Sequence, residues 1–152
     1  MGAELSRVYT IGHSNRAIDE FIQVLRRWGI KAVVDVRRFP VSRKYPWFNR
    51  EALMNVLASK GVEYFWLGEL LGGYREGGYR RYMQTLEYRR GIDMLKGILG
   101  RVNGPVAIMC SEKLWFKCHR RFISDTLVRE GFEVLHIIND RAVRHKAGYS
   151  PP

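Results

Sequence analysis

The apolar positions along the chain alternate between two spacings, and this alternation predicts strands that take turns with helices. Five short runs are rich in apolar and β-branched residues and are bounded by glycine, proline or polar residues. They cover residues 7–11, 31–36, 62–66, 105–109 and 133–138. The second run is almost continuously apolar, as expected for a strand that is buried on both faces of a parallel sheet.

Apolar residues at helical spacing fill the segments between these runs. A first helix has one apolar face, made of Ile18, Phe21, Ile22, Leu25 and Trp28. A second helix is expected to begin after Asn49, a good N-cap residue, and to end at Gly61. A third helical region covers residues 79–99, with a break expected near Gly91, and a fourth helix follows Cys118.

This order of elements, βαβαβαβαβ, predicts a single α/β domain over residues 1–138. We expect a mostly parallel five-stranded sheet with helices on both faces, a Rossmann-like three-layer sandwich. Residues 67–78 contain five glycines and are expected to form a mobile loop. Residues 139–152 lack periodicity, so a C-terminal tail that is loop or disordered is expected there.

The charge of the chain narrows the classes of partner. Lysine and arginine number 26 against 15 acidic residues, which gives a net charge of +11. This excess favours an anionic small molecule or nucleic acid, although a solvated basic surface is the alternative. No apolar run approaches the roughly 18 residues of a membrane span, so no membrane partner is expected. Two cysteines and no apolar leader favour the reducing cytoplasm.

The densest group of reactive side chains follows the fourth predicted strand. Cys110 and Glu112 come first, and Cys118, His119 and Arg120 stand where the next helix is expected to begin. Ligands of open α/β sheets bind beyond the carboxyl ends of the strands. Helix N-termini also favour anions and thiolates. The segment therefore predicts a binding or catalytic site.

The sequence leaves several interpretations of the two cysteines open. One of them is a nucleophilic thiolate, for which Cys118 is the better candidate because it stands at the predicted helix start. A disulfide, or a zinc site shared with His13 and His119, is an alternative. The remaining interpretation is that both thiols are small buried apolar groups with no chemical role. A phosphatase-type loop is absent, because Phe116 stands where that motif needs arginine.

Two earlier strands also end in polar residues. His13, Ser14 and Asn15 follow the first strand, where Ser14 or Asn15 is alternatively a helix N-cap. Asp35 lies inside an apolar strand and needs a partner, and Arg37 projects from the same face two residues later. Either the two form a structural ion pair, or Arg37 binds an anionic group with two hydrogen bonds.

Four motifs resemble those of a widespread prokaryotic domain-of-unknown-function family. They are TIGHSN at residues 10–15, VDVR-x-x-P-x-S at 34–42, LGG at 71–73 and C-x-E-x5-CHR at 110–120. The chain departs from the family pattern at residues 114–116, where an acid and a proline are expected, and this bears on the shape of the loop. The resemblance covers residues 9–138 and implies a small cytoplasmic α/β domain, but it implies no reaction.

We therefore predict an enzyme-like pocket at the carboxyl edge of the sheet for an anionic, phosphate-bearing substrate. A nucleic-acid-binding module without catalysis and a structural or regulatory interaction domain are the alternatives. No cofactor is predicted. The predicted catalytic residues are His13, Asp35, Cys110, Glu112, Cys118 and His119. The predicted anion-binding residues are Ser14, Asn15, Arg37, Ser42, Gly72, Gly73 and Arg120.

Overall fold

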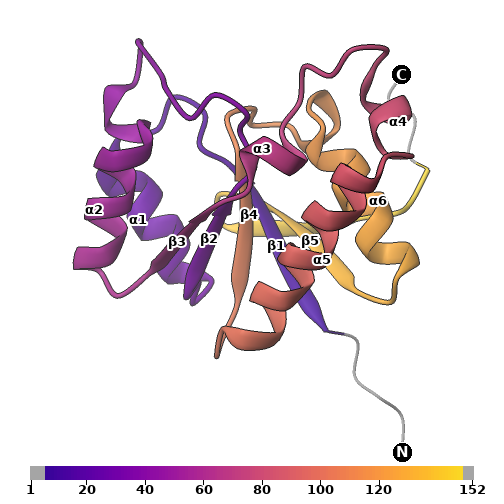
Figure 1. Cartoon of the computed structure of the whole chain (residues 1–152). Coiled ribbons are helices and arrows are strands. Elements are labelled where there is room, and N and C mark those ends of the chain that lie inside the picture. The colour runs from indigo at the N-terminus through magenta and orange to yellow at the C-terminus, as the bar shows by residue number, and fades with distance from the viewer. Residues whose placement is uncertain (1–5, 149–152) are drawn as a thin grey trace, which may run out of the picture.

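The computed structural model describes residues 6–148, which are built around one six-stranded mixed sheet (Figure 1). Five strands are parallel: β1 (Arg7–Gly12), β2 (Ala32–Asp35), β3 (Glu63–Trp66), β4 (Val106–Cys110) and β5 (Glu133–Ile138). The strand order is β3-β2-β4-β1-β5-β6. The prediction of an α/β domain with a mostly parallel sheet is confirmed.

A sixth strand corrects the expected number of five. β6 (Arg141–Arg144) pairs antiparallel with β5 after a tight turn in which Asn139 has a φ of 58°. Left-handed asparagine is typical of such hairpin turns. Three of the four β6 residues are exposed, so the strand shows no hydrophobic alternation. It lies in the segment that was expected to be loop or disordered; residues 149–152 of that segment lie outside the described residues.

Helices cover both faces of the sheet. Figure 1 shows α1 (Ile18–Arg27) and α2 (Arg50–Ser59) on one face, and α5 (Leu86–Arg101) and α6 (Arg120–Arg129) on the other. Successive strand residues point to opposite faces. Val33 accordingly packs with the apolar residues of α1 and α2, whereas Val34 packs with those of α5 and α6. The two hydrophobic clusters hold the layers together.

The helical region expected over residues 79–99 is broken, but not at Gly91. α4 (Tyr79–Tyr82) ends early, and α5 begins after Thr85, whose Oγ1 accepts a hydrogen bond from the backbone N–H of Tyr88. Gly91 lies inside α5, where a Cβ would stand 2.7 Å from the side chain of Leu71. The glycine therefore allows close packing of α3 (Gly68–Leu71), a short helix in the segment that was expected to be a mobile loop.

The strand register brings the polar strand ends to one edge of the sheet. Gly12 in β1 stands opposite Cys110 in β4, and Asp35 in β2 stands opposite Met109. Beyond the strand ends, the backbone N–H of His13 donates to the carbonyl of Cys110 over 2.8 Å. Across residues 6–148, no helix is both long and apolar enough to span a membrane.

Candidate functional site

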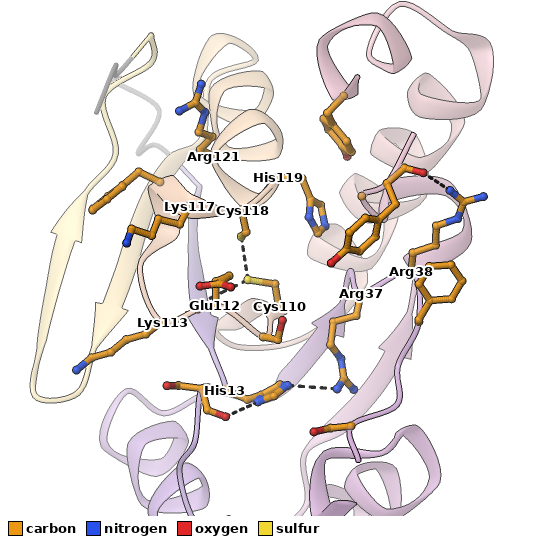
Figure 2. Close-up of a pocket in the computed structure, with 18 of the residues that line it drawn as sticks. His13, Arg37, Arg38, Cys110, Glu112, Lys113, Lys117, Cys118, His119 and Arg121 are labelled. Atoms are coloured by element: carbon orange, nitrogen blue, oxygen red, sulfur yellow. Dashed lines mark hydrogen bonds between the residues drawn. The ribbon is translucent and has the colours of Figure 1, made fainter. Parts of the chain in front are cut away.

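A cleft of about 1130 Å³ opens at the carboxyl edge of the sheet. Figure 2 shows Lys113, Lys117 and Arg121 on one side of it and Arg37 and Arg38 on the other, with Cys110, Cys118 and His119 between. Ten predicted site residues line it: His13, Ser14, Asn15, Arg37, Ser42, Gly73, Cys110, Glu112, Cys118 and His119. The other three, Asp35, Gly72 and Arg120, are not among its lining residues.

The two cysteines meet at the floor of the cleft. Their Sγ atoms are 2.9 Å apart, and both thiols are free. Cys110 ends β4, whereas Cys118 precedes α6, whose first residue, Arg120, donates its backbone N–H to Cys118 Sγ over 3.3 Å. The helix therefore begins two residues after the position expected from the sequence, and its first amide is directed at a sulfur atom.

The surroundings of the two sulfur atoms differ in their effect on ionisation. Burial raises the pKa of Cys118, but the hydrogen bond from Cys110, the charge of Arg120 and its amide outweigh burial and lower the pKa to about 6. Burial and the neighbouring sulfur raise the pKa of Cys110. The pair thus favours one thiolate, on Cys118, which accepts the S–H of Cys110.

Arg120 lies behind the cysteines and not in the cleft. Its side chain is 1% exposed. Its guanidinium donates to Thr10 Oγ1 over 3.2 Å and to the carbonyl of Glu112 over 2.9 Å. Among the described residues, its Nε is a buried side-chain nitrogen that has no hydrogen-bond partner. Arg120 therefore supplies fixed positive charge beneath the thiols and is not a free cation for a ligand.

Asp35 and Arg37 form a buried ion pair, one of the two alternatives left open by the sequence. Arg37 Nε and Nη2 donate to the two carboxylate oxygens of Asp35 over 2.9 and 2.8 Å. Tyr64 donates its hydroxyl to the same carboxylate, and Arg37 also donates to the carbonyl of Phe48. Arg37 touches the cleft, but most of its hydrogen bonds are made inside the protein.

Two histidines face the cleft, and they differ in how many of their ring nitrogens are hydrogen-bonded. His13 Nδ1 donates to the carbonyl of Ser14, so its Nε2 accepts from Arg37 Nη1 over 3.3 Å. His119 Nε2 donates to the carbonyl of Val36 over 2.8 Å. Within residues 6–148, Nδ1 of His119 makes no hydrogen bond. Burial lowers the pKa of both histidines to about 4, so both rings are neutral at pH 7. Nδ1 of His119 therefore carries a lone pair that can accept a hydrogen bond from a ligand.

The remaining predicted residues shape the cleft. Ser14 has a φ of 54° and donates its backbone N–H to Ser111, so it is not the N-cap of α1; Ala17 occupies that position. Ser42 accepts the backbone N–H of Tyr45 and thereby holds a loop. A Cβ on Gly73 would stand 3.2 Å from His119 Nδ1. Gly73 therefore leaves room for the imidazole.

Glu112 and the rim lysines carry the exposed charge. Glu112, Lys113 and Lys117 are all exposed in the segment between the two cysteines. Neither lysine forms an ion pair with a residue in the described range. Five cationic side chains line the cleft against one carboxylate, that of Glu112. The rim therefore favours an anion. The described residues contain no group of three or more His, Cys, Asp or Glu side chains placed to hold a metal ion.

Sequence reasoning missed a chain of buried polar groups behind Arg120. Thr10 Oγ1 contacts His136 Nδ1 at 2.6 Å, His136 Nε2 contacts His145 Nδ1 at 2.9 Å, and His145 Nε2 contacts Asp125 at 2.6 Å. The ring of Trp115 stacks on His136 with centroids 4.4 Å apart. A histidine inside the apolar run of β5 was the available signal, because a buried imidazole needs partners. His145 lies in the segment without periodicity, so no pattern in the sequence indicated that it is buried.

Comparison with known proteins identifies a family but no characterised relative. The family model described as "Domain of unknown function DUF488" matches residues 17–127. The searches of curated proteins and of solved structures found no match.

Proposed function

The chain belongs to the DUF488 family of unknown function, and we propose that its cleft binds an anionic, phosphate-bearing substrate and acts on it through a Cys118 thiolate. The observation that carries the proposal is the position of Cys118. Its Sγ lies 2.9 Å from Cys110 Sγ and accepts the first amide of α6, above the buried charge of Arg120. A thiolate with lowered pKa beside fixed positive charge is the usual form of a nucleophilic cysteine.

The charge of the rim supports an anionic substrate. Lys113 and Lys117 are exposed, without ion-pair partners in the described range, and Arg121 stands on the same side of the cleft (Figure 2). These three cations replace Arg37 and Arg120 as the anion ligands, because both arginines are bound inside the protein. The cleft volume of about 1130 Å³ accommodates a small metabolite or a short segment of a polymer.

The neighbouring groups suggest how a covalent step proceeds. Cys118 Sγ attacks an electrophilic phosphoryl or acyl centre of the substrate, an S–P or S–C bond forms, and the leaving group departs with the bonding electrons and takes a proton from water. His119 is neutral at pH 7, and its Nδ1 accepts a proton from the water that then hydrolyses this bond. His13 and Glu112 stand at the cleft wall, where they orient substrate or water.

The rate of alkylation by iodoacetamide, followed by mass spectrometry under reducing conditions, tests the thiolate. The wild-type rate at Cys118 is expected to follow an apparent pKa near 6, and Cys118→Ser is expected to remove it. Cys110→Ser keeps Cys118 and places a hydroxyl donor in the position of the Cys110 thiol, so it assigns the signal to Cys118. Rates at both thiols that follow an apparent pKa of about 8.5 or higher would contradict the proposal.

Protection of Cys118 from alkylation tests whether an anion binds at the rim of the cleft. Millimolar phosphate, compared with chloride at equal ionic strength, is expected to slow alkylation of Cys118, and Lys113→Ala/Lys117→Ala is expected to weaken that protection. Lys60→Ala, which removes an exposed lysine away from the cleft, is the matched control. Equal protection in both variants would exclude the rim lysines as ligands.

A nucleic-acid-binding module without catalysis is the second candidate, supported by the net charge of +11. This candidate predicts binding that weakens steeply with salt and is unchanged in Cys118→Ser. The alkylation profile separates the two, because a module without chemistry needs no thiolate.

A further inference from the structure

Two exposed aromatic rings stand at the edge of the cleft. Phe39 is 64% exposed and Tyr74 is 85% exposed, and both line the cleft. Their ring centroids are 6.1 Å apart. We call this pair the aromatic ledge. Adjacent exposed aromatic rings beside a cleft form a contiguous apolar surface, and such surfaces are typical of interaction sites.

Local contacts hold the ledge in place, although the backbone of Tyr74 has an unfavourable conformation. Tyr74 has a φ of 61°, in the left-handed region that bulky residues rarely occupy. Arg38 donates to the carbonyl of Tyr74, and its guanidinium lies 5.6 Å from the centroid of the Phe39 ring. An unfavourable backbone conformation that presents a ring to solvent indicates a binding role, because such conformations cluster at ligand sites.

The ledge and the rim cations lie on opposite sides of the cleft. Arg38, which contacts the Phe39 ring and the backbone carbonyl of Tyr74, stands across from Lys113, Lys117 and Arg121 (Figure 2). The space between the two sides runs over Cys118 and His119. A ligand that fits both sides has a flat aromatic part at one end and an anionic part at the other. Aromatic rings beside cations are the general means of binding bases together with phosphates.

We propose that the cleft binds a nucleoside phosphate, with its base stacked on the aromatic ledge of Phe39 and Tyr74 and its phosphate on Lys113, Lys117 and Arg121. This assignment rests on the proposed anion-binding function and names its substrate class. A free nucleotide and a single-stranded nucleic acid share this chemistry. The sugar and the phosphate ester bond then lie over Cys118.

Calorimetric titration of the intact chain with AMP, UMP, ribose 5-phosphate and inorganic phosphate tests whether the base contributes to binding. Both nucleotides are expected to bind at least roughly fivefold more tightly than ribose 5-phosphate, since stacking of one base is worth about 5- to 150-fold in affinity. A six-nucleotide single strand forms a further arm. Tighter binding of the single strand than of either mononucleotide identifies a polymer as the source, and the reverse identifies a free nucleotide.

Tyr74→Gly separates the role of the ring from its effect on folding. Glycine adopts the left-handed conformation freely, so the melting temperature is expected to stay the same or rise, while nucleotide affinity falls at least roughly fivefold. Tyr74→Trp is expected to retain binding. Leu86→Ala, which removes another exposed apolar side chain, is the control.

Two outcomes would overturn different statements. Equal binding of nucleotides and ribose 5-phosphate, or unchanged affinity in Tyr74→Gly, would refute the nucleoside while leaving the anion site intact. Failure of all four small ligands and of the single strand to bind would refute the phosphate site as well.

The buried chain behind Arg120 carries a second inference from independent geometry. Asp125 is a carboxylate, so His145 Nε2 donates to it; His145 Nδ1 then accepts from His136 Nε2, and His136 Nδ1 accepts the Thr10 hydroxyl. Thr10 Oγ1 in turn accepts from Arg120. Thr10, His136 and His145 thus each have one donor and one acceptor role, and the hydrogen bonds run in one direction from Arg120 towards Asp125.

The elements that supply this chain fix its geometry. Thr10 in β1 and His136 in β5 are register partners on one face of the sheet. The backbone N–H of His145 donates to Val134 in β5, and Asp125 lies in α6 about one and a half turns beyond Arg120. Asp125 is the member nearest to solvent, with its side chain 14% exposed, whereas that of His145 is fully buried.

We infer that Thr10, His136, His145 and Asp125 are positioning residues that hold the Arg120 guanidinium beneath Cys118. This inference rests on the Cys118 thiolate of the proposed function. Arg120 cannot rotate away while Thr10 Oγ1 accepts its Nη1 hydrogen, because that hydroxyl is itself fixed by His136. Side chains from β1, β5 and α6, and that of His145 just after β6, thereby hold one buried charge in place together with the carbonyl of Glu112.

Thr10→Val tests the inference, since valine has nearly the same shape but no hydroxyl. The pH profile of Cys118 alkylation is expected to shift upward, so that the rate at pH 5 falls about threefold, as for a pKa rise of roughly half a unit. Thr10→Ser is expected to restore the wild-type profile. Ser124→Ala, which removes a buried hydroxyl bonded to the backbone carbonyl of Arg120, is the stability control.

The result that would overturn this inference differs from the result that tests the thiolate. A wild-type profile near pH 6 with no shift in Thr10→Val would refute the positioning role alone. A wild-type profile at about 8.5 or higher would refute the thiolate itself.

Discussion

Removal of the Asp35 carboxylate is expected to lower the free energy of unfolding by about 3–5 kcal/mol, because it leaves a buried guanidinium without its counter-ion. Asp35 is fully buried and Arg37 is 6% exposed. The carboxylate accepts hydrogen bonds from Arg37 N, Nε and Nη2, over 3.0, 2.9 and 2.8 Å, and from the Tyr64 hydroxyl. After Asp35→Ala, the Arg37 guanidinium keeps the Phe48 carbonyl and His13 as its partners among residues 6–148.

The magnitude follows from what is lost and what remains. Hydrogen bonds to charged groups are worth about 1.5–3 kcal/mol each, but they are not additive and water enters the space left by the carboxylate. The measured cost of breaking one partner of a buried ion pair, about 3–5 kcal/mol, is therefore the better guide. Because Arg37 also contacts His13, the same change is expected to disturb the wall of the cleft.

Urea denaturation of four proteins measures the effect: wild type, Asp35→Ala, Arg37→Met and the double variant. The double variant is expected to be more stable than Asp35→Ala alone, because methionine removes the stranded charge. Arg37→Met is also expected to leave phosphate protection of Cys118 largely intact, since Arg37 is bound to Asp35. A loss below 1 kcal/mol in Asp35→Ala, or a double variant that is no more stable, would refute the reasoning.

Three further predictions concern the same edge of the sheet. Mild oxidation by diamide is expected to join Cys110 and Cys118, with a mass loss of two hydrogens and no alkylation, since the sulfur atoms already touch; a dimer instead would contradict the pairing. Gly12→Ala is expected to cost about 3 kcal/mol or more in urea denaturation, because its Cβ would stand 1.6 Å from a backbone oxygen; Gly97→Ala, with open space around it, is the control. Burial lowers the pKa of His13 and His119 from 6.5 to about 4, so the unfolded chain binds more protons between these values. The free energy of unfolding is therefore expected to fall as the pH drops through that window, by at most about 1.4 kcal/mol per pH unit for each histidine, and a flat profile would contradict this.

Much of the fold was predictable because local patterns and chain connectivity agree. Near-continuous apolar runs separated by amphipathic helices admit few arrangements other than a parallel sheet covered on both faces. The carboxyl ends of such strands meet at one edge, so His13, Arg37, Cys110 and Arg120 were expected to converge. The first three line the cleft, whereas Arg120 is buried behind it. The sixth strand was not predictable, since β6 is exposed and lacks alternation.

The sequence by itself determined which reactive groups stand at the strand ends and that their surroundings are basic. Only the tertiary structure decided which of those groups remain free. Arg37 and Arg120 are as basic in sequence as Lys113 and Lys117, yet the arginines are bound to buried acceptors and the lysines face solvent. Partners such as Thr10 and His136 come from strands more than a hundred residues apart. Hydrogen bonding and burial depend on that three-dimensional placement, which local sequence patterns do not encode.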